Sequence, residues 1–133
     1  MVNQVNRLQY HQFWLFVGWS LVVMVIYFSL NVGGLPGLNS FLHDKLSHLL
    51  GYSGLMLWFS QLYKTTKIRS LLAVLLACLG ITLEYLQGIG GIRMFEVADM
   101  LANATGVALG WILAVAGMDR ILGWFESRYL VRC

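Results

Sequence analysis

The amino-acid sequence predicts an all-α fold: an integral membrane four-helix antiparallel bundle with a short C-terminal interfacial helix. Composition is the first observation, because the 133 residues are 59% hydrophobic and 11% charged, whereas an ordinary soluble domain carries about 25% charged residues. Four long apolar runs are the second observation, and a one-sided distribution of Lys and Arg is the third. The length suits a single membrane domain, 1–133, with no sizeable part outside the membrane.

The four apolar runs predict the membrane spans. They are Phe13–Leu30, Leu46–Tyr63, Ser70–Gln87 and Val97–Met118. Each is close to the about 20 residues, range about 17–25, that a helix needs to cross the hydrocarbon core. The first run exceeds the ~7–15 apolar residues of a signal peptide, so we expect it to stay as a span. Charged and aromatic residues alternate after the fourth run, which predicts a helix lying at the membrane interface.

Basic residues predict the orientation. Seven of the nine Lys and Arg fall on one side of the expected bundle. They are Arg7, Lys64, Lys67, Arg69, Arg120, Arg128 and Arg132. The positive-inside rule then places both termini in the cytoplasm, for a multi-pass protein of the inner (plasma) membrane. Because these charges sit in short segments between spans, they are interpreted as topology signals and not as a nucleic-acid surface.

Polar residues inside the apolar runs collect at the opposite, outward-facing end. They are Asp44, Lys45, His48, Glu84, Gln87, Arg93, Asp99 and Asn103. Several lie three or four residues apart and therefore share a helix face. Ionisable groups at membrane depth are costly and usually serve a site or a paired network. We expect a ligand-binding cluster in which Lys45, Arg93 or His48 partners Glu84.

A purely structural ion network is the alternative for this cluster. Asp44 and Asp99 also fit as carboxylates in the first turns of their helices, where the helix dipole favours a negative charge. The segment Gly88–Gly91 is expected to be a flexible link, either as a tight turn or as backbone that approaches a ligand. Gly106 and Gly110 form a GxxxG pattern that favours close helix packing, within the bundle or across a dimer. The oligomeric state stays open.

At these residues the chain resembles the VanZ-like family. The resemblance rests on Asp44-Lys45-Leu46-Ser47-His48, on Glu84-Tyr85-Leu86-Gln87, and on Arg93 followed by Asp99, Asn103, Gly106 and Gly110. It implies a polytopic inner-membrane protein. Some members lower susceptibility to teicoplanin, a lipid-tailed glycopeptide that acts outside the membrane, and an outward-facing polar site is compatible with that role.

Three functions remain open from the sequence. In the first, the site binds or modifies an envelope component, such as a lipid-linked cell-wall precursor or a lipoglycopeptide, and membrane lipid surrounds the spans. In the second, the chain is an intramembrane enzyme that uses acid–base chemistry or a divalent metal. That metal would be held by Asp44, His48, Glu84 and Asp99, although no ligand spacing assigns one and no cofactor is expected. In the third, the chain is a non-catalytic scaffold.

Overall fold

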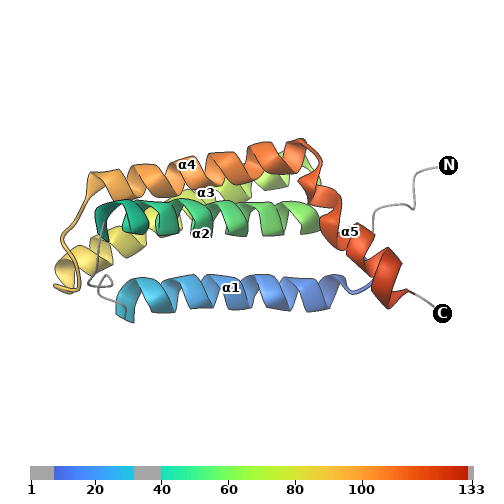
Figure 1. Ribbon diagram of the computed structural model, residues 1–133, viewed down its shortest axis with the longest axis horizontal. Helices are drawn as coiled ribbons and strands as arrows, with labels where there is room; N and C mark the ends of the chain where they lie inside the picture. The colour runs from blue at the N-terminus through green and yellow to red at the C-terminus, as the bar shows by residue number, and fades with distance from the viewer. Residues whose placement is uncertain (1–7, 32–39, 132–133) are drawn as a thin grey trace.

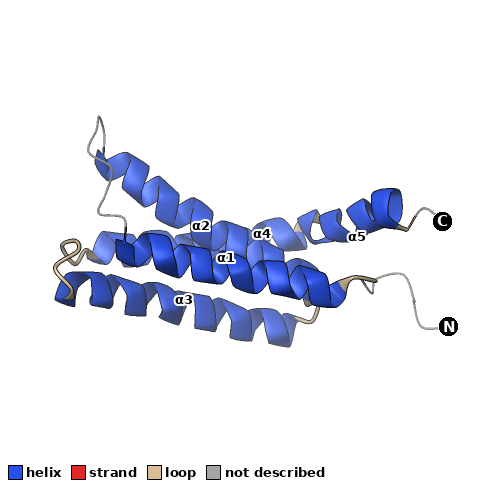
Figure 2. Cartoon of the chain, turned by 90° about the horizontal axis from the view of Figure 1, so that it is seen from below, coloured by secondary structure: helices blue, strands red, loops and turns tan. Residues whose placement is uncertain are grey.

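The computed structural model describes residues 8–31 and 40–131, with the side chains of residues 40–42 left aside, and the regular elements of this part are all helical (Figure 2). The long helices are α1 (His11–Asn31), α2 (Ser40–Leu62), α3 (Thr66–Ile89) and α4 (Val97–Val115). The shorter elements are η1 (Met118–Arg120), α5 (Ile121–Phe125) and η2 (Glu126–Leu130). The predicted all-α class is therefore confirmed, and each predicted span falls largely within one long helix. Arg7 and Arg132, used for the orientation, lie outside the described residues.

Two helix ends differ from the prediction. Helix α2 begins at Ser40, so Asp44 lies beyond its first turn, and the helix-dipole explanation fails for that residue. Helix α3 continues to Ile89, so Gly88 is helical instead of part of a flexible link. The turn comes afterwards, at Gly91, whose φ of 64° is a left-handed conformation that favours glycine.

Helices α1, α3 and α4 are, among the described residues, the three that are long and apolar enough to cross a membrane. Helix α2 is not one of them, although the sequence predicts an apolar span at Leu46–Tyr63. Its first turns carry the polar residues of the cluster, which lower its hydropathy. Helix α2 instead contacts α1, α3 and α4 and buries Tyr52, Met56 and Phe59 in the core. Neighbouring helices shield it, so it tolerates more polar side chains than its partners do.

Glycines set the distance between α2 and α4. A Cβ atom added at Gly106 would lie 2.5 Å from the backbone oxygen of Leu49, and one added at Gly110 would collide with the backbone oxygen of Ser53. The two backbones therefore pack directly against each other within the chain. Asp99 and Asn103 share a helix face with these glycines, so the same close approach presses them against α2.

The long helices lie side by side, and consecutive helices run in alternating directions (Figure 1). The start of α2, the end of α3 and the start of α4 consequently meet at one end of the molecule. The end of α2, the start of α3 and the end of α4 meet at the other, next to α5. Polar residues far apart in the sequence are brought together by this arrangement, and a charged cluster forms at each end.

Candidate ligand-binding site

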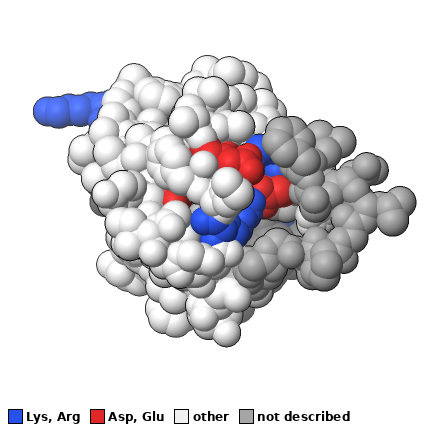
Figure 3. Space-filling view, turned by 90° about the vertical axis from the view of Figure 1, so that its left-hand side faces the viewer, with Lys and Arg blue, Asp and Glu red and all other residues white. Residues whose placement is uncertain are grey.

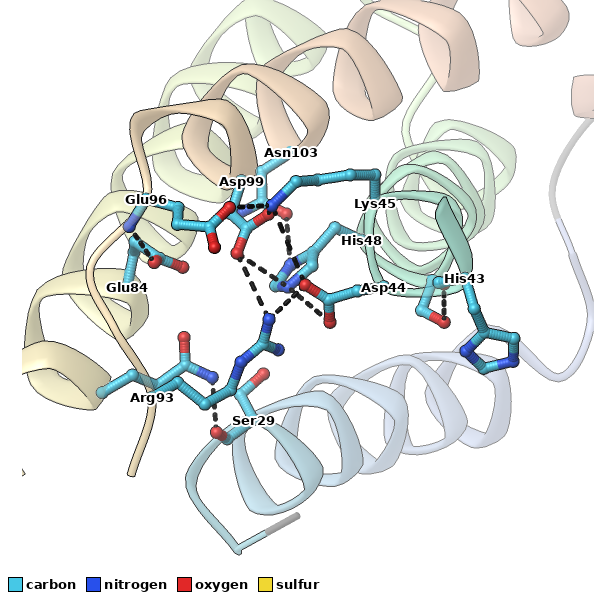
Figure 4. Close-up of polar contacts among 12 residues, drawn as sticks. Ser29, His43, Asp44, Lys45, His48, Glu84, Arg93, Glu96, Asp99 and Asn103 are labelled. Carbon is cyan, nitrogen blue, oxygen red and sulfur yellow. Dashed lines mark hydrogen bonds and ion pairs between the residues drawn. The ribbon is translucent and has the colours of Figure 1, made fainter. Parts of the chain in front are cut away.

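Charged side chains gather at the end of the molecule away from α5 (Figure 3). We call this group the Asp44 cluster: Asp44, Lys45 and His48 from α2, Arg93 from the connection after α3, and Glu96 and Asp99 from the start of α4. Figure 4 shows these side chains pointing toward one another across the gap between α2 and α4. The structure thus brings together most of the polar residues that the sequence singles out, and adds Glu96.

Lys45 joins α2 to the first turn of α4. Its Nζ donates to Asp99 and, at 2.5 Å, to Glu96 Oε2. Asp99 is 1% exposed, whereas the Glu96 side chain is 42% exposed. The lysine therefore reaches from a buried carboxylate to one at the surface, and it crosses the helix interface that the glycines keep narrow.

Arg93, in the connection between α3 and α4, contacts two carboxylates of the cluster. Its guanidinium donates to Asp44 Oδ2 and lies 3.5 Å from Asp99 Oδ2. The hydrogen bond to Asp44 raises the pKa of Arg93 above its ordinary value, so the group stays charged at any physiological pH. A planar guanidinium at this position suits recognition of a carboxylate or phosphate.

His48 lies between Asp44, which is partly exposed, and the buried Asp99. Its Nδ1 is 2.9 Å from Asn103 Oδ1, and because an amide oxygen can only accept, the Nδ1–H donates this hydrogen bond. The other ring nitrogen, Nε2, lies 3.9 Å from Asp44 Oδ1 and 3.8 Å from Asp99 Oδ2. Asn103 thus fixes the ring so that Nε2 faces two carboxylates.

The sequence predicts Lys45, Arg93 or His48 as the partner of Glu84, but among the described residues its hydrogen-bond partner is a backbone group, and Arg93 acts on it only through longer-range electrostatics. Glu84 Oε1 accepts a hydrogen bond from the backbone N–H of Glu96 at 2.9 Å, and no donor among the described residues reaches the buried Oε2. Lys45 and Arg93 are engaged by other carboxylates. The backbone N–H at the start of α4 takes their place, where the helix dipole favours a negative group.

Gln87 stands apart from the ion pairs. Its Nε2 donates to the backbone oxygen of Ser29 at 2.6 Å and so connects the end of α3 to the end of α1. Gln87 is 2% exposed. It closes one side of the space beside the cluster instead of joining the cluster itself.

A cavity of 270 Å³ opens beside the Asp44 cluster between α1, α2 and α3. Its polar wall includes Asp44, His48, Gln87 and Arg93, and its apolar wall includes Met24, Val25 and Phe28 of α1. The volume is a little below the about 300–1,000 Å³ typical of small-molecule pockets. It can hold a polar headgroup or a short length of chain, with charge on one side and apolar surface on the other.

Sequence reasoning missed part of this site. Glu96 is recognisable as an acid near the cluster, yet its contact with Lys45 depends on the turn before α4. The contribution of α1 has no sequence signal, since Met24, Val25 and Phe28 resemble any other residues of an apolar span. His43 also lines the cavity, but its ring points away from the cluster (Figure 4).

A second charged cluster lies at the α5 end and is called the Arg69 cluster: Lys64, Arg69 and Asp119. Arg69 donates to the backbone oxygens of Ser60 and Tyr63 at 2.7 and 2.9 Å and to Asp119 Oδ2 at 2.5 Å. Burial opposes ionisation of Asp119, but the hydrogen bond from Arg69 and the charge of Lys64 outweigh it and hold the pKa of Asp119 below its ordinary value. Burial also lowers the pKa of Lys64, against the attraction of Asp119.

Glu126 forms a separate contact at the same end. It is 4% exposed and accepts hydrogen bonds from the backbone N–H groups of Gln9 and Tyr10 at 2.8 and 3.0 Å and from Trp14 Nε1 at 2.6 Å. The carboxylate therefore sits at the start of α1, where orphan N–H groups need acceptors. It fastens the C-terminal segment to the first helix.

Comparisons with models of known protein families, with curated proteins and with solved structures gave no match to this chain. Its function therefore rests on the chemistry of the residues described above.

Proposed function

We propose that this chain is an integral membrane protein of the VanZ-like family, a four-helix antiparallel bundle in the inner membrane with both termini in the cytoplasm. Large apolar side chains exposed on α1, α3 and α4, such as Phe16, Leu71 and Ile112, support membrane insertion, because soluble monomers rarely expose wide apolar patches. The basic residues near the α5 end support the orientation. The adjoining positions of the three motif segments support the family assignment.

In this membrane protein, the Asp44 cluster and the adjoining cavity bind an amphipathic envelope component at the outer surface. The candidates are a lipid-linked cell-wall precursor and a lipoglycopeptide, both of which join a polar, anionic or amide-rich head to an apolar tail. The observation that carries the proposal is a cavity with charged groups on one wall and the apolar face of α1 on the other.

Each wall has a role in this proposal. Arg93 meets a phosphate or carboxylate of the headgroup, and a charge-assisted contact of this kind is about twice as strong as a neutral hydrogen bond. Gln87 and His48 contact hydroxyl or amide groups. Phe28 and Met24 pack against the first part of the tail, and the remainder extends into the surrounding lipid because the cavity is too small for a whole lipid.

Binding by the purified full chain in detergent tests this proposal, with a polyprenyl-phosphate-linked precursor and a lipoglycopeptide as the two probes and native mass spectrometry as the readout. Arg93→Ala is expected to weaken binding of at least one probe by at least about tenfold, since a charge-assisted hydrogen bond contributes roughly 1.5–3 kcal/mol. Phe28→Ala is expected to weaken the same probe by a smaller factor.

Arg128→Ala is the matched control, because Arg128 is an exposed arginine at the α5 end. It should bind as the wild type does. Circular dichroism and gel filtration check that each variant remains helical and monodisperse. Equal affinities for wild type, Arg93→Ala and Phe28→Ala, or no saturable binding of either probe, would overturn the proposed function.

A further inference from the structure

Three potential metal ligands converge inside the Asp44 cluster. Asp44 Oδ1, His48 Nε2 and Asp99 Oδ2 offer one ligand atom each, and ligand atoms of these three residues lie within 4.8 Å of one another. Metal–nitrogen and metal–oxygen bonds of about 2.0–2.2 Å place neighbouring ligands about 3–4 Å apart. The distances from His48 Nε2, 3.9 Å to Asp44 and 3.8 Å to Asp99, need a contraction of only a few tenths of an ångström.

The other oxygen of each carboxylate is already engaged. Asp44 Oδ2 accepts from Arg93, and Asp99 Oδ1 accepts from Lys45. The inner oxygen, Asp99 Oδ2, is buried and receives no hydrogen bond from any described residue. A buried carboxylate oxygen without a donor is unusual. Here it faces a histidine nitrogen and an aspartate. A cation bound between these groups would interact favourably with all three.

The orientation and tautomer of His48 also suit a metal ligand. A metal-binding imidazole usually donates its second ring N–H to a fixed acceptor, which sets the tautomer and the ring orientation. His48 donates from Nδ1 to Asn103 Oδ1, so Nε2 presents its lone pair to the two aspartates. A Cβ at Gly80 would lie 2.9 Å from Asn103 Nδ2, and this tight packing from α3 holds Asn103 in place.

We propose that Asp44, His48 and Asp99 bind one divalent cation of the Zn²⁺ and Mn²⁺ type. One imidazole and two carboxylates form a mixed nitrogen–oxygen set that these ions accept, whereas Mg²⁺ and Ca²⁺ favour ligand sets made of oxygen alone. Glu84, the fourth residue in the metal hypothesis from the sequence, is absent from this triad. Three protein ligands leave a coordination position open, and Asp44 and His48 also line the cavity.

The charge of the site supports a cation. Within the described part of the chain, the carboxylates of Asp44, Glu96 and Asp99 meet the permanent cations Lys45 and Arg93. The carboxylate of Glu84 lies beside them on the backbone N–H of Glu96. Four carboxylates against two cations give a formal charge of −2 when all four are ionised and His48 is neutral. One divalent ion neutralises this charge. Neutralisation lowers the free-energy cost most for the carboxylates that are almost fully buried, because an unpaired buried charge is strongly destabilising. Arg93 remains 3.5 Å from Asp99 Oδ2, so the ion and the guanidinium share that carboxylate.

This inference does not depend on the proposed ligand, and its test uses the metal alone. The full-length protein is purified in detergent, stripped with a chelator and titrated with Co²⁺, whose absorption spectrum reports its ligands. The wild type is expected to saturate at one Co²⁺ per chain, and Zn²⁺ is expected to displace it. Asp99→Asn and His48→Gln are expected to weaken binding by at least about tenfold.

His11→Gln is the matched control for His48→Gln, because His11 lies at the start of α1, at the opposite end of the molecule from the Asp44 cluster (Figure 1). It should bind Co²⁺ as the wild type does. The proposal fails if the wild type shows no saturable Co²⁺ spectrum, if folded Asp99→Asn binds as tightly as the wild type, or if His11→Gln loses binding. Where the variants do not fold, the wild-type titration and the His11→Gln control still decide. Failure of the lipid-binding test leaves this titration unaffected.

Discussion

Each end of the helix bundle holds a charged cluster, and cations outnumber carboxylates at one end while carboxylates outnumber cations at the other. In the Arg69 cluster, one carboxylate meets two cations, and the guanidinium also donates to two backbone oxygens. In the Asp44 cluster, three carboxylates meet the two permanent cations Lys45 and Arg93. The buried Asp99 Oδ2, like Oε2 of the adjoining Glu84, receives no hydrogen bond from the described residues. Cavities border both clusters, one beside Asp44, His48 and Arg93 and the other beside Lys64 and Asp119, so the balance of donors and acceptors is what distinguishes the two ends.

This difference separates a structural role from a binding role. A cluster whose donors and acceptors match each other holds helices together and offers little to a ligand. A cluster with surplus acceptors retains groups that a ligand or a cation can satisfy. Stability is therefore expected to depend strongly on the Arg69 cluster, and binding on the Asp44 cluster.

The largest stability effect is expected at Arg69. Arg69→Met keeps the apolar length of the side chain but leaves the backbone oxygens of Ser60 and Tyr63 and the carboxylate of Asp119 without their main donor. Each backbone oxygen left without its donor costs about 1–3 kcal/mol, so the loss of Arg69 is expected to cost about 3–5 kcal/mol in total. The free energy of unfolding, measured by denaturant titration in micelles with circular dichroism, should fall by that amount.

Lys67→Met is the control for this prediction. Lys67 is exposed on the first turns of the same helix, so its replacement should change the free energy of unfolding by less than about 0.5 kcal/mol. If Arg69→Met and Lys67→Met are equally stable, the Arg69 cluster does not hold the helices together and the contrast between the two ends disappears.

A pH dependence from Asp119 is expected to be smaller. The pKa of Asp119 is lower in the folded protein than its ordinary value of 3.8, so the folded state binds fewer protons than the unfolded state near that pH. The resulting stabilisation is complete above about pH 4 and is lost as the pH falls through the folded pKa. It should amount to roughly 1 kcal/mol, because the ion pair is partly exposed to solvent.

Asp119→Asn isolates this contribution from the other carboxylates. Unfolding is measured for both proteins between about pH 6 and about pH 3. The wild type should lose more stability over this range than Asp119→Asn does. Parallel pH profiles for the two proteins would show that the Arg69–Asp119 pair contributes no acid sensitivity.

The sequence predicts the helices and the convergence of the polar residues better than it predicts individual partners. Apolar runs locate all four long helices. Sequence reasoning does not anticipate that α2 is less apolar than the other three. Its apolar content can be lower because neighbouring helices cover it. The i, i+4 spacing of Asp44 and His48, together with the glycines of α4, is enough to anticipate that these two helices meet at a polar face.

Individual contacts escape sequence reasoning when a backbone group makes them. The partner of Glu84 is the N–H of Glu96, and no pattern of side chains indicates which backbone donors a turn leaves free. The same holds for Glu126, whose acceptor role at the start of α1 depends on where the C-terminal segment folds back. The sequence also gives no sign of the apolar wall of the cavity, because residues such as Phe28 differ from other apolar residues of the same helix only in position.

The smallest stability effect is expected at Glu84, and comparing it with a matched glutamate at the α5 end tests the difference between the two clusters directly. Glu84→Gln keeps the oxygen that accepts from the Glu96 N–H and replaces only Oε2, which has no hydrogen-bond partner among the described residues, so the free energy of unfolding should change by no more than about 1 kcal/mol. Glu126→Gln is the matched variant at the other end. Its three donors engage both carboxylate oxygens, and an amide nitrogen cannot accept, so a loss of about 1.5–3 kcal/mol is expected. A Glu84→Gln protein that is destabilised as much as Glu126→Gln would identify the Asp44 cluster as a second structural network, with the surplus carboxylates serving the bundle instead of a ligand.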